Sequence, residues 1–158
     1  MDNNDILRRA RYIFDFNDKK MMKLFRLGGI EASREEISNW LKKEDDLDFD
    51  SINDKMLAVF LNGFIISKRG ARGDEPPKPE SSLSNNLILR KFKIALELKD
   101  DDMLEALELT GIYISKHELS AFFRNPKQKQ YRLCKDQILR NFLRGLQIKH
   151  RGDGDLLA

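Results

Sequence analysis

The sequence repeats itself. Shifting the chain by 82 positions aligns residues 3–70 with residues 85–152 without a gap, and 21 of the 68 aligned pairs are identical. The most similar stretches, 54–70 and 136–152, both fit the pattern D-x-x-L-x-x-F-L-x-G-x-x-I-x-x-R-G. Self-similarity of this kind predicts two copies of one structural unit. Residues 71–84 carry three prolines with Gly, Ser and charged residues, and predict an extended linker between the copies.

Each copy is expected to contain four helices, because apolar residues recur at helical spacing. In the first copy, Asn4 is expected to cap the first helix. The second helix is expected to begin at Asp18 and to end at Gly29. Ser33 with Glu36 forms a capping box that predicts the start of the third helix. The second copy repeats these signals at Asn86, Asp100, Gly111, Ser115 and Glu118.

The fourth helix of each copy carries a glycine in its middle, Gly63 or Gly145. A glycine there costs about 1 kcal/mol relative to alanine, so close approach of another helix is expected, with the other copy's fourth helix as the expected partner. Repeats of this length are near the lower limit for an independent core. The predicted fold is therefore all-α, with two pseudo-symmetric tandem four-helix repeats packed around a shared core. Two separate small domains on a flexible linker are the second architecture.

The two copies differ in charge. Residues 85–152 contain 14 Lys and Arg against 8 Asp and Glu, whereas residues 3–70 contain 13 against 12. A basic strip with an aromatic residue in the second copy could hold nucleic-acid phosphates, although most such strips are solvated surface. Residues 27–43 also resemble a helix-turn-helix, but acidic residues follow and would repel phosphates. The candidate residues of the strip are Arg124, Lys127, Lys129, Tyr131, Arg132, Arg140 and Arg144.

A second candidate site is shared by both copies, in the motif N-N-x-I-L-R that opens each one. On a helical wheel, Arg8 lies about 160° from the centre of the apolar stripe, and Arg90 repeats this placement. These arginines, with Asn4 and Asn86, are candidates for contact with a ligand or partner. The alternative is a local hydrogen bond or a salt bridge to a neighbouring helix.

The sequence shows no motif for catalysis. Neither histidine is shared between the copies, and the acidic residues kept in both copies stand at predicted helix starts, where capping explains them. No metal-ligand spacing or phosphate-binding loop is present, the acidic stretch 44–50 lacks the glycine and glutamate of a calcium loop, and no cofactor is expected. The single cysteine, Cys134, suits a reducing cytoplasm. No signal peptide or apolar run of membrane-spanning length is visible, so a cytoplasmic protein without a membrane partner is expected.

The opening motif, the segment G-I-x-x-S-x-x-E/H-E-I/L-S-x-W/F and the F-L-x-G-x-x-I-x-x-R-G end together resemble the bacterial YehS-like family. The resemblance covers residues 3–152 and implies a bacterial source and a duplicated helical domain of unknown function. It implies no activity. From the residues we expect a non-catalytic binding or adaptor module for a protein partner. A nucleic-acid-associated regulator using the basic face of the second copy is the alternative, and an enzyme with an unrecognised site is the third hypothesis.

Overall fold

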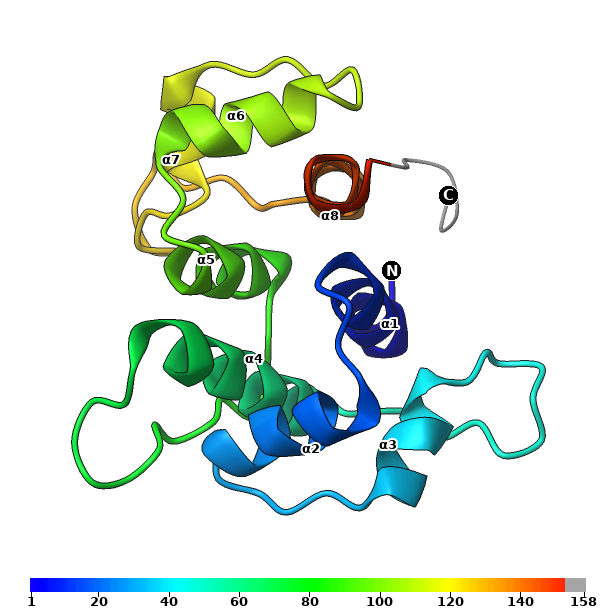
Figure 1. The fold of residues 1–158 in the computed structure, drawn as a ribbon. Helices are drawn as coiled ribbons and strands as arrows, with labels where there is room; N and C mark the ends of the chain where they lie inside the picture. The colour runs from blue at the N-terminus through cyan, green and yellow to red at the C-terminus, as the bar shows by residue number, and fades with distance from the viewer. Residues whose placement is uncertain (153–158) are drawn as a thin grey trace. The chain divides into compact units, whose positions relative to one another are not determined.

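The computed structural model describes residues 1–152, which fold into α-helices and connecting segments without a strand in that range (Figure 1). The chain forms two compact units, Met1–Leu83 and Ser84–Ala158, called unit 1 and unit 2 below. The helices of unit 1 are α1 (Asn3–Ile13), α2 (Asp18–Leu27), α3 (Arg34–Leu41) and α4 (Asp54–Arg69). Those of unit 2 are α5 (Asn85–Ala95), α6 (Asp100–Glu108), α7 (Lys116–Ala121) and α8 (Asp136–Arg151). Each helix of unit 2 begins 82 positions after its counterpart, so the predicted all-α duplication is confirmed.

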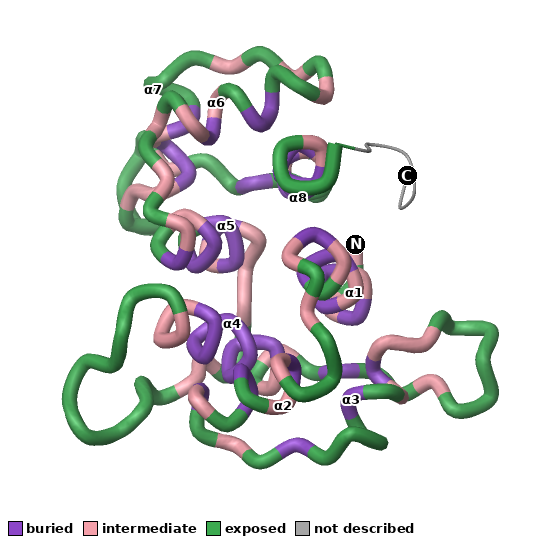
Figure 2. The backbone as a smooth tube through the Cα atoms, in the orientation of Figure 1, coloured by how far each residue is buried: buried purple, intermediate pink, exposed green. Residues whose placement is uncertain are grey.

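The longest helix of unit 1, α4, forms the centre of that unit. All its residues from Leu57 to Phe64 are buried, as expected for a helix that is apolar around most of its circumference (Figure 2). Helix α2 packs along α4, and α1 packs against α3. Phe25 lies between Trp40 and Phe60, with ring centroids 5.3 Å from each. In unit 2, α6 packs along α8 in the same way.

The helix starts follow local side-chain chemistry. Ser33 and Glu36 form the predicted capping box of α3, and the equivalent pair in unit 2 forms that of α7. The predicted cap of the first helix was wrong. Asp2 caps α1 by accepting a hydrogen bond from the Asp5 backbone, and Ser84 caps α5. Asn4 and Asn86 lie inside these helices instead and point into the protein interior.

The mid-helix glycines allow close helix contact, but the expected partner was wrong. A Cβ atom placed on Gly63 would lie 1.7 Å from the carbonyl oxygen of Leu24, on α2 of the same unit. A Cβ atom on Gly145 would lie 1.9 Å from the carbonyl oxygen of Ala106, on α6. Each glycine therefore serves helix packing within its own unit.

The segment that follows α4 belongs to unit 1. Its last residue, Leu83, donates a backbone hydrogen bond to Oδ2 of Asp54, at 2.8 Å. Pro76 lies beside Gly29, since a Cβ atom on that glycine would be 3.1 Å from the proline Cγ. The prolines and charged residues of this segment thus run back over the unit that precedes them.

Candidate functional site

The shared asparagines hold the loop between the third and fourth helices of each unit. The Nδ2 atom of Asn4 donates to the carbonyl oxygens of Trp40 (2.9 Å) and Asp50 (2.8 Å), and its Oδ1 atom accepts from the Ile52 backbone (3.3 Å). Asn86 repeats this in unit 2. It donates to Phe122 (3.0 Å) and Arg132 (2.8 Å), and accepts from Cys134 (2.9 Å). Both side chains are buried. With every amide hydrogen and the carbonyl oxygen engaged, each asparagine fixes a loop and has no donor left for a ligand.

The preceding asparagines extend the same arrangement to the fourth helix. Asn3 donates to the carbonyl oxygen of Ile52 (3.2 Å) and to Oδ1 of Asp54 (2.7 Å), at the first residue of α4. Asn85 donates to Cys134 and Asp136 at 3.0 and 2.7 Å. In each unit the repeated N-N pair therefore links the first helix, the loop and the fourth helix by hydrogen bonds, an arrangement called the asparagine fastening below.

The shared arginines differ between the units. In unit 1, Nη1 of Arg8 donates to the carbonyl oxygen of Lys42 at 2.8 Å, and Nη2 forms a 2.9 Å ion pair with Asp5. In unit 2, Nη2 of Arg90 donates to the carbonyl oxygen of Phe123 at 2.7 Å. The residue equivalent to Asp5 is Leu87. The contact with a loop carbonyl is thus kept, whereas the local carboxylate is lost.

Unit 2 carries a groove of about 490 Å³ at this position. Four of the predicted candidates line it, namely Asn86, Arg90, Arg124 and Tyr131. Four apolar residues, Leu87, Phe122, Phe123 and Pro126, and two polar ones, Ser84 and Asn125, complete the lining. The groove therefore combines two guanidinium groups and a phenol with an apolar wall.

Arg124, the other arginine of the groove, also lacks an acidic neighbour that its counterpart in unit 1 has. In unit 1, Nζ of Lys42 lies 3.7 Å from Oδ2 of Asp48. The equivalent positions in unit 2 are Arg124 and Gln130. Within residues 1–152, the one polar contact of the Arg124 side chain is a long one, 3.5 Å from the Ser120 hydroxyl. Both basic residues of the groove have therefore lost the acidic neighbour present in unit 1, and an anion could supply it.

The remaining candidates lie outside the groove. Lys127, Lys129 and Arg132 are exposed on the loop between α7 and α8. Arg140 and Arg144 lie on α8 and do not line the groove. The structure thus brings together only part of the predicted basic strip.

Sequence reasoning missed the apolar residues that form the groove. Leu87, Phe122, Phe123 and Pro126 were not among the candidates, because apolar residues next to a helix are normally assigned to the core. The exchange of Asp5 for Leu87 between the copies was a visible signal, since it removes an acid three positions before a kept arginine.

The single cysteine, Cys134, lies in the interior of unit 2. Cys134 is buried, and burial, with a smaller contribution from the charge of Asp136, raises the pKa of its thiol from 9.0 to about 12. A thiol in this state is a poor nucleophile and a poor metal ligand at neutral pH. Across residues 1–152, His, Cys, Asp and Glu nowhere gather in a group of three that could hold a metal ion. None of the helices within that range is both long and apolar enough to cross a membrane.

Together, the duplication and the asparagine fastening define a class of small, tandemly repeated four-helix proteins. The model of a family described as "Protein of unknown function (DUF1456)" matches residues 3–70 and again residues 85–152, so the chain belongs to this family. The chain is also 44% identical over 150 residues to "Uncharacterized protein YehS" of Escherichia coli (strain K12), covering 94% of this chain and 96% of that protein. No solved structure matches the chain.

Proposed function

We propose that this protein is a non-catalytic binding module, and that the unit 2 groove binds a protein partner through a segment with a carboxylate next to an apolar side chain. The observation that carries this proposal is the comparison of the two copies. Arg8 forms an ion pair with Asp5, whereas the position equivalent to Asp5 near Arg90 is occupied by Leu87. The guanidinium of Arg90 keeps its 2.7 Å bond to the loop, so it is held in place for a ligand at little further entropic cost.

The shape and lining of the groove favour a peptide. Two arginines can bind a carboxylate through charge-assisted hydrogen bonds, and guanidinium groups are suited to such pairing. Leu87 and Pro126, which are partly or fully exposed, offer apolar surface beside them. Aromatic and arginine residues are enriched at the centres of protein interfaces. A peptide side chain such as Leu or Phe would therefore bury apolar area while an adjacent acid pairs with the arginines.

Fluorescence anisotropy tests this with labelled peptides containing Asp next to Leu or Phe, the same peptides with Lys in place of Asp, and a mixed-sequence single-stranded oligonucleotide. We expect the acidic peptides to bind and the Lys peptides not to bind. Arg90→Ala is expected to weaken binding at least about tenfold, since hydrogen bonds to charged groups contribute about 1.5–3 kcal/mol.

Leu87→Asp is the sharper variant. It installs the ion pair that unit 1 already tolerates, and it should abolish binding while leaving the helical circular dichroism and the thermal midpoint unchanged. Lys55→Ala, an exposed site on α4, is the matched control. If the oligonucleotide binds and Leu87→Asp removes that binding, the nucleic-acid alternative is correct. The proposal is wrong if no probe binds and if wild type and Leu87→Asp capture the same proteins from nuclease-treated host lysate.

A further inference from the structure

Helix α2 of unit 1 and its counterpart in unit 2, α6, carry opposite charges at equivalent positions. On α2 the basic residues are Lys19, Lys20, Lys23 and Arg26. The residues at the same positions of α6 are Asp101, Asp102, Glu105 and Glu108. Every one of these four pairs is inverted in sign, although the buried residues of the two helices remain apolar. Helix packing within each unit does not require this inversion, because the charged side chains lie on the outer faces.

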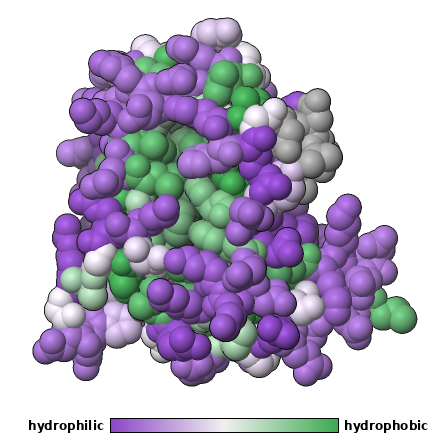
Figure 3. Space-filling view, viewed as in Figure 1, coloured by the Kyte–Doolittle hydropathy of each residue, from purple (hydrophilic) through white to green (hydrophobic). Residues whose placement is uncertain are grey.

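The basic face of unit 1 is available for binding. Met22 and Lys23 stand three and four positions after Lys19, and four and three positions before Arg26, so the four residues lie on one stripe of α2. They line a shallow hollow of about 570 Å³ together with Lys20. Lys19 and Lys23 form no hydrogen bond or ion pair with another residue in the described part of the chain. Figure 3 shows hydrophilic side chains over α2, which lies at the front of unit 1 in this view.

The positive charges on the basic face of α2 repel one another. Burial lowers the pKa of Lys20, and the neighbouring charges of Lys23 and Lys68 lower it further. Its Nζ atom donates to the Ser67 hydroxyl at 2.9 Å, which supplies no negative charge. Among the basic residues of this face, Arg26 is the one with an acidic neighbour in the described part of the chain, Glu31 at 3.1 Å, and both side chains are mostly exposed. An acidic surface placed on this face would relieve the repulsion between the lysines.

The acidic face of unit 2 has a matching pattern. Asp101 pairs with Lys116 at 3.1 Å and Glu105 with Lys149 at 3.5 Å. The two acidic side chains remain 78% and 58% exposed, so these pairs contribute little to stability and are readily exchanged. Leu104 stands at the position equivalent to Met22, and both are partly exposed. Each face therefore has an apolar residue surrounded by charges of one sign, which is the arrangement of an interface core and rim.

We propose that the basic face of α2 binds the acidic face of α6 on a second copy of this chain. A contact that brings equivalent surfaces of two similar units together is nearly two-fold symmetric, so side chains from one set of positions meet side chains from the same set on the other unit. Like charges at those positions would repel, and charges of opposite sign would attract. Because each chain has one face of each sign, a two-fold dimer makes the contact twice. The loops after α3 and α7 also carry opposite charges at equivalent positions, with Asp45 at the position of Lys127 and Asp50 at that of Arg132.

A charge-swap experiment on the full chain tests this proposal. Sedimentation velocity measures the association of wild type, of K19E/K23E, which makes both faces acidic, and of D101K/E105K, which makes both faces basic. Wild type is expected to form a dimer that dissociates when NaCl rises from about 0.1 M to about 1 M, which shortens the Debye length from about 10 Å to about 3 Å. Each variant alone should associate at least about tenfold more weakly, because like charges at an interface repel.

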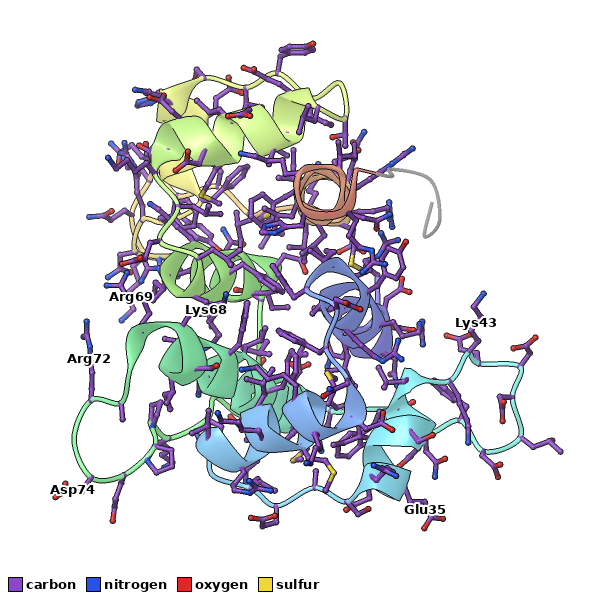
Figure 4. All side chains as sticks on the ribbon, viewed as in Figure 1. Glu35, Lys43, Lys68, Arg69, Arg72 and Asp74 are labelled. Atoms are coloured by element: carbon purple, nitrogen blue, oxygen red, sulfur yellow. The ribbon has the colours of Figure 1, made fainter. Side chains whose placement is uncertain are left out.

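Complementation separates a specific contact from a general effect of charge. An equal mixture of K19E/K23E and D101K/E105K should form a heterodimer, because each variant face then meets an oppositely charged face on the other chain. Combining all four changes in one chain should restore self-association. The control variants K43E/R72E and E35K/D74K change net charge equally, at exposed side chains of unit 1 that do not belong to α2 (Figure 4). They should dimerise like wild type.

Two results would overturn the proposal. One is a wild type that stays monomeric at low salt and high concentration. The other is a dimer that the face variants leave intact, or that the control variants weaken equally. If the α2 face instead binds heparin while the chain stays monomeric, the partner is an anionic polymer and not a second copy. Circular dichroism of each variant confirms folding before association is measured.

Discussion

Replacing Gly63 by alanine is expected to destabilise unit 1, although alanine is the better helix former. The new Cβ atom would lie 1.7 Å from the carbonyl oxygen of Leu24 and 2.7 Å from its carbonyl carbon. A comfortable carbon–oxygen contact is about 3.3 Å, so α2 and α4 would have to separate by roughly 1.5 Å. The atoms in the way belong to the backbone and cannot move aside by changing rotamer.

The magnitude follows from two opposing contributions. Alanine gains about 1 kcal/mol in helix propensity over glycine. Overpacking of a close-packed interior costs about 1–3 kcal/mol and occasionally more. Here the separation also loosens Leu24 and Phe25, which are completely buried along α4. Because the clash is with backbone atoms, we take the upper end of this cost, about 3 kcal/mol, and expect a net decrease of about 2 kcal/mol in the free energy of unfolding.

Urea denaturation followed by tryptophan fluorescence measures this loss. Trp40 is the only tryptophan of the chain, and it packs against Phe25 in unit 1, so it reports on the helices that the substitution disturbs. Lys55→Ala, on the exposed side of the same helix, should change stability by no more than about 0.5 kcal/mol. A midpoint for Gly63→Ala equal to or above that of wild type would show that the helices are not in backbone contact, and would refute this account of the glycine.

Three further outcomes are expected. Asn86→Ala should lower the free energy of unfolding by about 2–4 kcal/mol in urea titrations, because it leaves two carbonyl groups and the Cys134 amide unpaired. An equal loss of stability from a substitution at an exposed residue would contradict a structural role for the buried Asn86 amide. Cys134 should resist thiol reagents at pH 8 in the folded protein and react quickly in urea; its raised pKa should also make stability fall as pH rises from about 9 to about 12, since the unfolded state loses this proton first. Ser115→Ala should cost about 1 kcal/mol by removing the capping box of α7, with Ser81→Ala, exposed in the segment before α5, as the neutral control in the same thermal melts.

Much of the fold could be predicted from sequence because its signals are local. Apolar spacing, the two serine capping boxes and the glycine after the second helix each act within a few residues. The repeat then supplied each signal twice, which is why the helix starts fall 82 positions apart in the structure. Asn4 shows where this reasoning fails. Its position before an apolar stripe looks like a cap, but Asp2 takes that role, and the Asn4 amide instead bonds to backbone groups more than 30 residues away.

The candidate site was predictable only in part, for the same reason. Charge and aromatic content indicated Arg124 and Tyr131, and the repeat indicated Arg90, but their separation in sequence gave no sign that they share one groove. That groove forms because Asn86 fastens the loop after α7 onto α5. Lys129 is as basic as the arginines yet lies outside it, since loop geometry and not composition decides which side chains converge.

The sequence by itself determined the order of the helices and most of their starts, the equivalence of the two copies, and the inverted charges of α2 and α6. These properties depend on residue type and on spacing along one helix. Only the tertiary structure decided that Gly63 meets Leu24, that the repeated asparagines hold loops, and that Arg90 shares one groove with residues of the loop after α7. Those facts depend on which distant segments come within hydrogen-bonding or van der Waals distance, and a one-dimensional pattern does not specify that distance.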